Sequence, residues 1–148
     1  MKKNLLWLLA PLMMACIGAG CSEEEHSSYY IKGDKLTCNK GCHFLKYSPR
    51  DIKDYPDFLN VKEIESSDAV ESWFQSYIWT GKLDGKRYYG THSSLMSQSY
   101  GYVYDETGEY FRPIRNDDNW TDIEVIYIPS KYIEHCKKNN EPLWIEVP

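Results

Sequence analysis

The stretch that decides the fold is "IWTGKLDGKRYYG", residues 78–90. Apolar and aromatic residues alternate with polar ones on both sides of its centre, and a period of two is typical of β-strands. At the centre stand Asp84 and Gly85, which tolerate the positive φ angles of a two-residue hairpin turn. The stretch therefore predicts two antiparallel strands joined at these two residues.

A second stretch follows the same plan. "YGYVYDETGEYFRPI", residues 100–114, places aromatic runs on either side of Glu106, Thr107 and Gly108. Glycine after a polar pair is typical of a turn, so a second hairpin is predicted here. Two copies are too few for a solenoid repeat, and we interpret them as successive hairpins.

Three other stretches predict the remaining strands. "KLTCNKGCHFLKY", residues 35–47, has two short apolar runs on either side of residues 39–41 and predicts a third hairpin. "DIEVIYI", residues 122–128, and "PLWIEV", residues 142–147, predict one strand each.

The clearest helix is expected to begin at Asp68, with Glu71 completing a capping box. Its apolar stripe recurs at a spacing of three and four residues and contains Val70, Trp73, Phe74, Tyr77 and Ile78. Such a stripe covers one face of a sheet.

Two shorter helices are predicted. One begins at Ser48 and Pro49 and is stopped by Pro56, because proline removes a backbone donor and clashes with the preceding turn. The other begins near Ser130 and ends at Asn139 and Asn140, where asparagine can adopt a left-handed conformation.

Together these elements predict one domain over residues 34–148. Its class is α+β, with a small antiparallel sheet of about six strands built from hairpins and two or three short helices packed on one face. Residues 21–33 are polar and lack periodicity, so we expect them to be a flexible tether in front of the domain.

The N-terminus is typical of an export signal. Lys2 and Lys3 precede an apolar run over residues 5–17 that is shorter than the roughly 20 residues needed to cross a bilayer. Small residues follow and lead to Cys21. We therefore exclude residues 1–20 from the fold as a signal peptide.

Residues 18–21 resemble the lipobox of bacterial lipoproteins, in which the cysteine receives a diacylglycerol and becomes the first mature residue. Gly18 departs from the family pattern, which has leucine there, and Cys16 is the competing site. Residues 22–25, a serine and three glutamates, resemble the surface-export signal of Bacteroidota lipoproteins. The resemblance implies a lipid anchor on Cys21 in the outer membrane, on its surface or, as the alternative, on the periplasmic side.

Removing residues 1–20 takes away two lysines and changes the formal charge from −5 to −7. This acidic balance argues against nucleic acid as a partner, because binding phosphates requires clustered Lys and Arg.

Cys38, Cys42 and Cys136 remain for the folded part. An exported protein meets an oxidising compartment, so we expect a disulfide, either between Cys38 and Cys42 or from one of them to Cys136. Cys38, Cys42 and His43 also resemble the Cys-x-x-Cys-His motif of c-type cytochromes, with one residue more between the cysteines. With His135 and Cys136 they offer more than the four ligands that a closed zinc site needs, so a zinc or haem protein is a minor alternative. The main expectation is a protein without metal or cofactor.

No catalytic motif stands out. His135 and Cys136 are neighbours and diverge by about 100° on a helix, and His92 lies beside serines without the strained turn that activates a nucleophile. We expect no enzymatic activity and assign no catalytic residue.

The aromatic content is high, with 13 Tyr and 5 Trp. Tyr and Trp bury a large area at low entropic cost and dominate binding hot spots. Neighbours on a strand point to opposite faces, so the hairpins are expected to expose an aromatic surface. Its predicted residues are Tyr88, Tyr89, Tyr100, Tyr102, Tyr104 and Tyr110. The leading hypothesis is a non-enzymatic protein-binding or inhibitor module, of which an immunity-type lipoprotein is one form, that captures a basic partner; the alternative is a glycan-binding lipoprotein.

Overall fold

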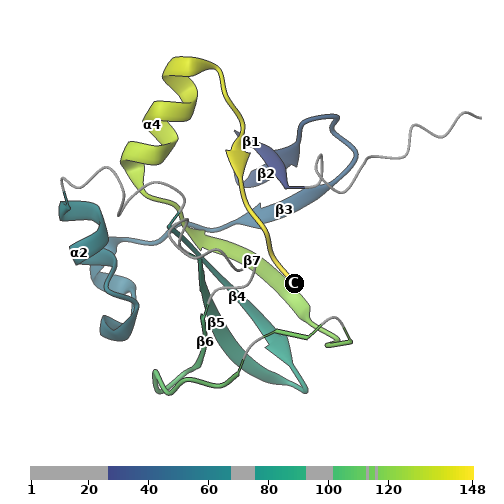
Figure 1. Ribbon diagram of the computed structural model, residues 1–148, viewed down its shortest axis with the longest axis vertical. Helices are drawn as coiled ribbons and strands as arrows, with labels where there is room; N and C mark the ends of the chain where they lie inside the picture. The colour runs from purple at the N-terminus through teal and green to yellow at the C-terminus, as the bar shows by residue number, and fades with distance from the viewer. Residues whose placement is uncertain (1–26, 68–75, 93–101, 113, 116) are drawn as a thin grey trace, which may run out of the picture.

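The computed structural model describes residues 27–67, 76–92, 102–112, 114–115 and 117–148. In these residues an eight-stranded sheet runs through the molecule, with two α-helices and two 3-10 helices beside it (Figure 1). The strands are β1 (Ser28–Lys32), β2 (Lys35–Cys38), β3 (Phe44–Tyr47), β4 (Tyr77–Leu83), β5 (Lys86–His92), β6 (Tyr102–Asp105), β7 (Thr121–Tyr127) and β8 (Leu143–Trp144). The helices are η1 (Ile52–Asp54), η2 (Asp57–Leu59), α2 (Val61–Ser66) and α4 (Ser130–Asn139).

The strands lie in the order β6-β5-β4-β7-β3-β2-β1-β8. Each neighbouring pair is antiparallel except β3 and β7, which run parallel. The predicted α+β class is confirmed, but the sheet has eight strands where about six were expected. The parallel pair arises because the chain leaves the sheet after β3, returns as β4, and later inserts β7 between them.

The hairpin predicted around Asp84 and Gly85 is confirmed as β4 and β5. Both turn residues have positive φ, 52° and 77°, as a two-residue turn requires. Further along, Gly90 lies opposite Trp79, and a Cβ on Gly90 would stand 1.9 Å from the indole ring. Gly90 therefore makes room for a buried tryptophan at the centre of the sheet.

The predicted tether is wrong over its second half. β1 begins at Ser28, lies between β2 and β8, and buries Tyr29 to 2% exposure. Gly33 and Asp34 form the turn that joins β1 to β2. The polar residues around Tyr29 and Ile31 hid the strand, because Tyr29 is its one buried hydrophobic residue. The folded domain thus begins before Asp34.

The predicted helix from Asp68 is wrong at its C-terminal end. Tyr77 and Ile78 belong to strand β4, while residues 68–75 lie outside the described residues. Both side chains are buried because the sheet is covered on both faces here, and burial on two faces produces an apolar run that resembles a helical stripe.

The segment after β3 also differs from its prediction. Instead of one helix ended by Pro56, it forms η1, η2 and then α2, and Pro56 stands at the N-terminal cap of η2. Proline is favourable at a helix start, where its missing N–H would have no partner. Asn60, with φ at 51°, separates η2 from α2.

The core has two parts, one on each face of the sheet. Tyr77 and Ile78 are successive residues of β4 and so point to opposite faces. The face of Tyr77 packs against α4 in a cluster that also contains Trp79, Val125, Tyr132 and Cys136. The face of Ile78 packs against the η2 and α2 segment in a cluster with Tyr55, Leu59, Val61 and Tyr89. The helices thus cover both faces, where one was predicted.

Tyrosine hydroxyls fix the C-terminal segment. The hydroxyl of Tyr77 accepts the N–H of Glu146 at 2.6 Å and donates to its carbonyl oxygen at 2.7 Å. The hydroxyl of Tyr132, on α4, accepts the N–H of Trp144 at 2.9 Å. As predicted, α4 ends at a left-handed asparagine, Asn140. The short strand β8 is thereby held by side chains as well as by β1.

Candidate binding surface

The candidate site lies at the end of the sheet formed by β6. This strand pairs with β5 on one side, and on the other side the chain turns back over residues 109–111. The N–H of Phe111 donates to the carbonyl of Val103 at 2.8 Å, and the N–H of Asp105 donates to the carbonyl of Glu109 at 3.0 Å. The second predicted hairpin is therefore present, although its outer arm is short.

The turn between the arms is held by Asp105. Its carboxylate accepts the backbone N–H of Thr107 at 2.9 Å, the hydroxyl of Thr107 at 2.6 Å and the N–H of Glu109 at 3.0 Å. These hydrogen bonds, led by the Thr107 hydroxyl, lower the pKa of Asp105. The turn is therefore rigid without help from a ligand.

Three tyrosines contact one another on this hairpin. Tyr102 and Tyr104 lie on the same face of β6, and Tyr110 is bridged to Tyr104. The ring centroids are 5.9 Å apart for Tyr102 and Tyr110, 6.4 Å for Tyr102 and Tyr104, and 6.5 Å for Tyr104 and Tyr110. Tyr102 is 46% exposed and Tyr110 53%. We call these three residues the tyrosine surface.

The tyrosine surface rests on the partly buried Phe58 and the buried Tyr89. Phe58, from η2, contacts the rings of Tyr89 and Tyr104 at 5.8 and 6.0 Å. A Cβ on Gly108, whose φ is +87°, would lie 2.8 Å from the Phe58 ring. Burial, followed by the neighbouring tyrosines, raises the pKa of Tyr104, so its hydroxyl is protonated at neutral pH.

The predicted binding residues divide into three groups. Tyr102, Tyr104 and Tyr110 come together at the surface. Tyr88 and Tyr89 do point to opposite faces, but both are buried, at 7% and 8% exposure, so their assignment to the exposed surface is corrected. Tyr88 packs against Phe111 and Trp120, and Tyr89 against Phe58. Tyr100 lies outside the described residues.

Sequence reasoning missed Phe58. This residue is 46 positions before Tyr104 in the chain, and only the chain path through η2 brings the two rings together. The one local signal is Gly108, because a turn glycine also permits close approach by another side chain.

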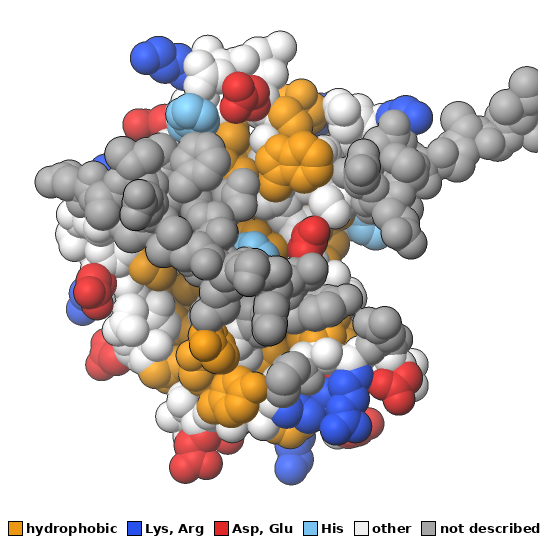
Figure 2. Space-filling model, in the orientation of Figure 1, with side chains coloured by type: hydrophobic (Ala, Val, Ile, Leu, Met, Phe, Trp, Pro, Cys, Tyr) orange, Lys and Arg blue, Asp and Glu red, His pale blue; other side chains and the backbone are white. Residues whose placement is uncertain are grey.

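Exposed carboxylates adjoin the tyrosine surface. Glu106 and Glu109 stand in the turn that joins Tyr104 to Tyr110, and Asp57 precedes Phe58. In the space-filling view, both acidic and basic side chains lie beside hydrophobic ones over the lower part of the molecule, where β5 and β6 lie (Figure 2). Three exposed carboxylates thus adjoin the tyrosine surface.

Arg112 and Asp118 fix the chain where it leaves the hairpin. Two nitrogens of the Arg112 guanidinium donate to the Asp118 carboxylate at 3.0 and 2.5 Å, and the N–H of Arg115 adds a third contact at 2.9 Å. The hydrogen bond from Arg112 lowers the pKa of Asp118 to about 2. The positive charge of Arg112 is therefore paired with Asp118. The outer arm of the hairpin is held by Asp105 at its start and by Arg112 at its end.

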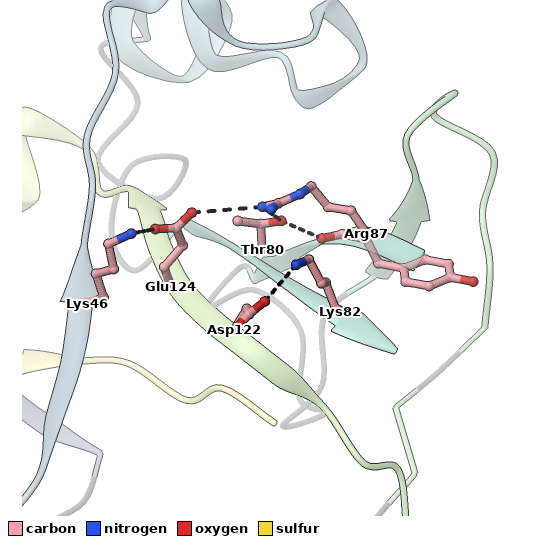
Figure 3. Close-up of polar contacts among 7 residues, drawn as sticks. Lys46, Thr80, Lys82, Arg87, Asp122 and Glu124 are labelled. Atoms are coloured by element: carbon pink, nitrogen blue, oxygen red, sulfur yellow. Dashed lines mark hydrogen bonds and ion pairs between the residues drawn. The ribbon is translucent and has the colours of Figure 1, made fainter. Parts of the chain in front are cut away.

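A charged network around Glu124 lies on the sheet face that also carries Tyr104 (Figure 3). Glu124 of β7 is 14% exposed and receives Lys46 Nζ at 2.8 Å and Arg87 Nη1 at 3.9 Å. Burial acts to raise the pKa of Glu124, but hydrogen bonds from Lys46 and Ser48 and the charge of Arg87 hold it below its ordinary value. Lys82 and Asp122 form a second pair at 2.7 Å.

The cysteines do not form the predicted disulfides. Cys38 and Cys136 carry free thiols. The sulfur of Cys38 lies 3.1 Å from that of Cys42, beyond the roughly 2.05 Å of a bond, and accepts the N–H groups of Cys42 and His43 at 3.2 Å. Cys136, on α4, directs its thiol to the carbonyl of Pro142 at 3.7 Å. The predicted pairings, Cys38 with Cys42 or either of them with Cys136, are therefore wrong, although Cys42 is itself disulfide-bonded.

The described part of the chain holds no group of three or more His, Cys, Asp or Glu side chains arranged for a metal ion. No helix among the described residues has the length and hydrophobicity needed to span a bilayer. The proposed lipidation site, Cys21, lies outside these residues.

No protein-family model, characterised protein or solved structure matches this chain.

Proposed function

We propose that this protein is a lipid-anchored, non-enzymatic module of the bacterial envelope that captures a basic protein through the tyrosine surface. The observation that carries the proposal is a group of three mutually contacting tyrosines, of which Tyr102 and Tyr110 are solvent-exposed, on a hairpin that its own hydrogen bonds hold in place. A rigid aromatic group loses little entropy on binding, and such groups dominate protein interfaces.

The shape of the tyrosine surface favours a protein over a glycan. The ring planes are inclined to one another by 45° to 76°, so the three rings present an uneven relief. Side chains of a partner protein can insert between inclined rings. An extended sugar chain stacks best on exposed rings that share a plane, which this group does not offer. Glycan binding is the alternative that the experiment below distinguishes.

The charge around the tyrosine surface favours a basic partner. Asp57, Glu106 and Glu109 are exposed beside it, whereas Arg112 is paired with Asp118. Complementary charge speeds encounter and excludes partners of the same sign. An aromatic centre with a charged rim is also the usual anatomy of a protein interface.

The location is proposed from the lipobox-like residues 18–21. Two or more acyl chains on Cys21 would anchor the domain firmly, since one chain alone binds reversibly. The anchored protein without a bound partner would then lie at the membrane, with the tyrosine surface available for binding.

Photocrosslinking in native cells tests the proposed function. A benzoylphenylalanine placed at Tyr102 should give a discrete crosslink to a basic protein. The same residue placed at Glu134, which is exposed on α4, is the matched control and should not give that product. The additional changes Phe58→Ala and Tyr110→Ala should abolish the crosslink from position 102.

Three outcomes contradict the proposal: no crosslink from position 102, the same product from position 134, or a product that is digested by glycosidases and contains no second polypeptide. The last result would support the glycan alternative.

A further inference from the structure

A second surface with different chemistry lies at the opposite end of the sheet. Strand register places Lys32 opposite Lys35, and Lys35 opposite Lys46. Paired residues of neighbouring strands lie on the same face. Three lysines therefore form an unbroken row across β1, β2 and β3, and all three are exposed.

Exposed aromatic residues lie on the same face as this row. Phe44 is two residues before Lys46 on β3, is 59% exposed, and has Lys35 Nζ at 5.8 Å from its ring centroid. Trp144 of β8 is 47% exposed and pairs with Ser28, which alternation places on the face of Lys32. We call Lys32, Lys35, Lys46, Phe44 and Trp144 the lysine face.

The lysine row is costly in the free protein. Like charges directly opposite each other on neighbouring strands repel. Lys46 is balanced by Glu124, but no described carboxylate forms an ion pair with Lys32 or Lys35. In a chain with a net charge of −5, this local excess of positive charge is most easily explained by an anionic ligand.

We propose that the lysine face docks on the anionic headgroups of a lipid bilayer. Lysines near a membrane surface are attracted to anionic lipids, and Trp is enriched at the level of the headgroups, where its ring is partly buried and its N–H stays hydrated. The lysine face combines both features on one side of β8, β1, β2 and β3. The contact adds to, and is separate from, capture of a protein by the tyrosine surface.

The position of the N-terminus fits this arrangement. Only six residues separate Cys21 from Ser28, the first residue of β1, so the tether reaches at most roughly 25 Å. This step rests on the proposed lipidation of Cys21. A short tether keeps the end of the sheet that holds β1 close to the bilayer and raises the effective concentration of the lysine face there.

Vesicle co-sedimentation tests the inference without the lipid anchor. Residues 22–148 contain every described strand, helix and core residue, and can be prepared free of lipid. This protein should bind vesicles in which a third of the lipid is phosphatidylglycerol and not vesicles of phosphatidylcholine alone. Binding should vanish in 1 M salt, where the screening length is about 3 Å.

Variants distinguish binding through the lysine face from non-specific attraction between any lysine and the anionic membrane. Each lysine near the surface contributes about fivefold in affinity, so Lys32→Gln with Lys35→Gln should weaken binding about 25-fold. Lys53→Gln with Lys62→Gln, on η1 and α2, removes the same charge elsewhere and should leave binding within about twofold. Trp144→Ser should weaken binding to anionic vesicles at a salt concentration that leaves the wild type bound.

The inference is overturned if neither type of vesicle binds, if both types bind equally, or if the two double variants weaken binding to the same degree. Absence of binding would leave an acidic protein as the ligand of the lysine face. None of these outcomes bears on the crosslink from position 102, which reports on the tyrosine surface alone.

Discussion

The two ends of the sheet carry opposite chemistry on one continuous face. Cross-strand pairing links them in a single row, which runs through Lys32, Lys35, Lys46, Glu124, Thr80, Tyr89, Tyr104 and Tyr110. The row begins with three lysines, passes the partly buried Glu124, the buried Thr80 and the buried Tyr89, and ends with two residues of the tyrosine surface. The difference between its ends shows how one small sheet can offer a basic and an acidic aromatic surface without mixing them.

Glu124 is what separates the two surfaces. It takes up the charge of Lys46 on one side and that of Arg87 on the other, so positive charge does not extend toward the tyrosines. Thr80 follows it in the row with its side chain fully buried and hydrogen-bonded to the carbonyl of Tyr88 at 2.8 Å. The covered centre keeps the two exposed ends apart.

The largest effect is expected for Gly90→Ala, which should destabilise the whole sheet and with it both surfaces. The added methyl group would occupy the space of the Trp79 ring, and overpacking of this severity costs about 3 kcal/mol or more. Urea unfolding should show this loss of stability. Gly85→Asn is the control, because the turn is open and asparagine accepts a positive φ; a similar loss there would show that the Trp79 contact is not the cause.

A smaller loss of stability is expected for Glu124→Gln, the variant that most directly tests whether Glu124 separates the two surfaces. Hydrogen bonds to a charged group contribute about 2 kcal/mol, and both partners of Glu124 are partly exposed, so the free energy of unfolding should fall by no more than that. Binding to anionic vesicles should nevertheless strengthen, because Lys46 and Arg87 lose their counter-charge. Asp122→Asn, in an exposed pair with Lys82, should change stability by less than about 0.5 kcal/mol. Weaker vesicle binding by the Glu124 variant would contradict the separating role.

Acid should affect the tyrosine end before the lysine end. The pKa of Asp118 is lowered to about 2 in the folded protein, so its contribution to stability is present above its unfolded pKa of about 4 and is lost as the pH falls to about 2. Hydrogen exchange of residues 109–112 should accelerate over this range, while that of β1 and β2 lags behind. In Asp118→Asn the exchange of residues 109–112 should already be fast at neutral pH; equal acid sensitivity of wild type and variant would refute the assignment.

The smallest effect is expected for Lys35→Glu, and it should be a gain in stability. A glutamate between Lys32 and Lys46 replaces repulsion by attraction, which contributes about 0.5 kcal/mol across antiparallel strands. Thermal unfolding measures the gain, and the same variant should lose binding to anionic vesicles. A loss of stability would mean that the row is not repulsive in the free protein.

The sequence predicted what depends on neighbouring residues. The hairpin at Asp84 and Gly85 and the end of α4 at Asn140 follow from local φ preferences, and both are confirmed. The position of Tyr102 and Tyr104 on one face of β6 also followed from alternation along the strand. The prediction that Tyr88 and Tyr89 are exposed failed, because alternation gives the face of the sheet on which a residue lies but not what covers that face.

What depends on distant pairing could not be read from the chain. The pairing of Lys46 with Glu124 requires the parallel contact of β3 and β7, and no local sequence pattern predicts that contact. The place of Phe58 beneath the tyrosines depends on the path of the chain through η2. β1 was missed because the polar tether composition continues into a strand in which Tyr29 is the one buried hydrophobic residue.

The separation of the two surfaces is the central claim, and vesicle co-sedimentation of three proteins tests it most directly. The wild type and Tyr102→Ala with Tyr110→Ala should bind phosphatidylglycerol-containing vesicles equally well, because both keep the lysine face. Lys32→Gln with Lys35→Gln should stay in solution. If the tyrosine variant is also released, or the lysine variant remains bound, the two ends of the sheet are not the separate binding surfaces described above.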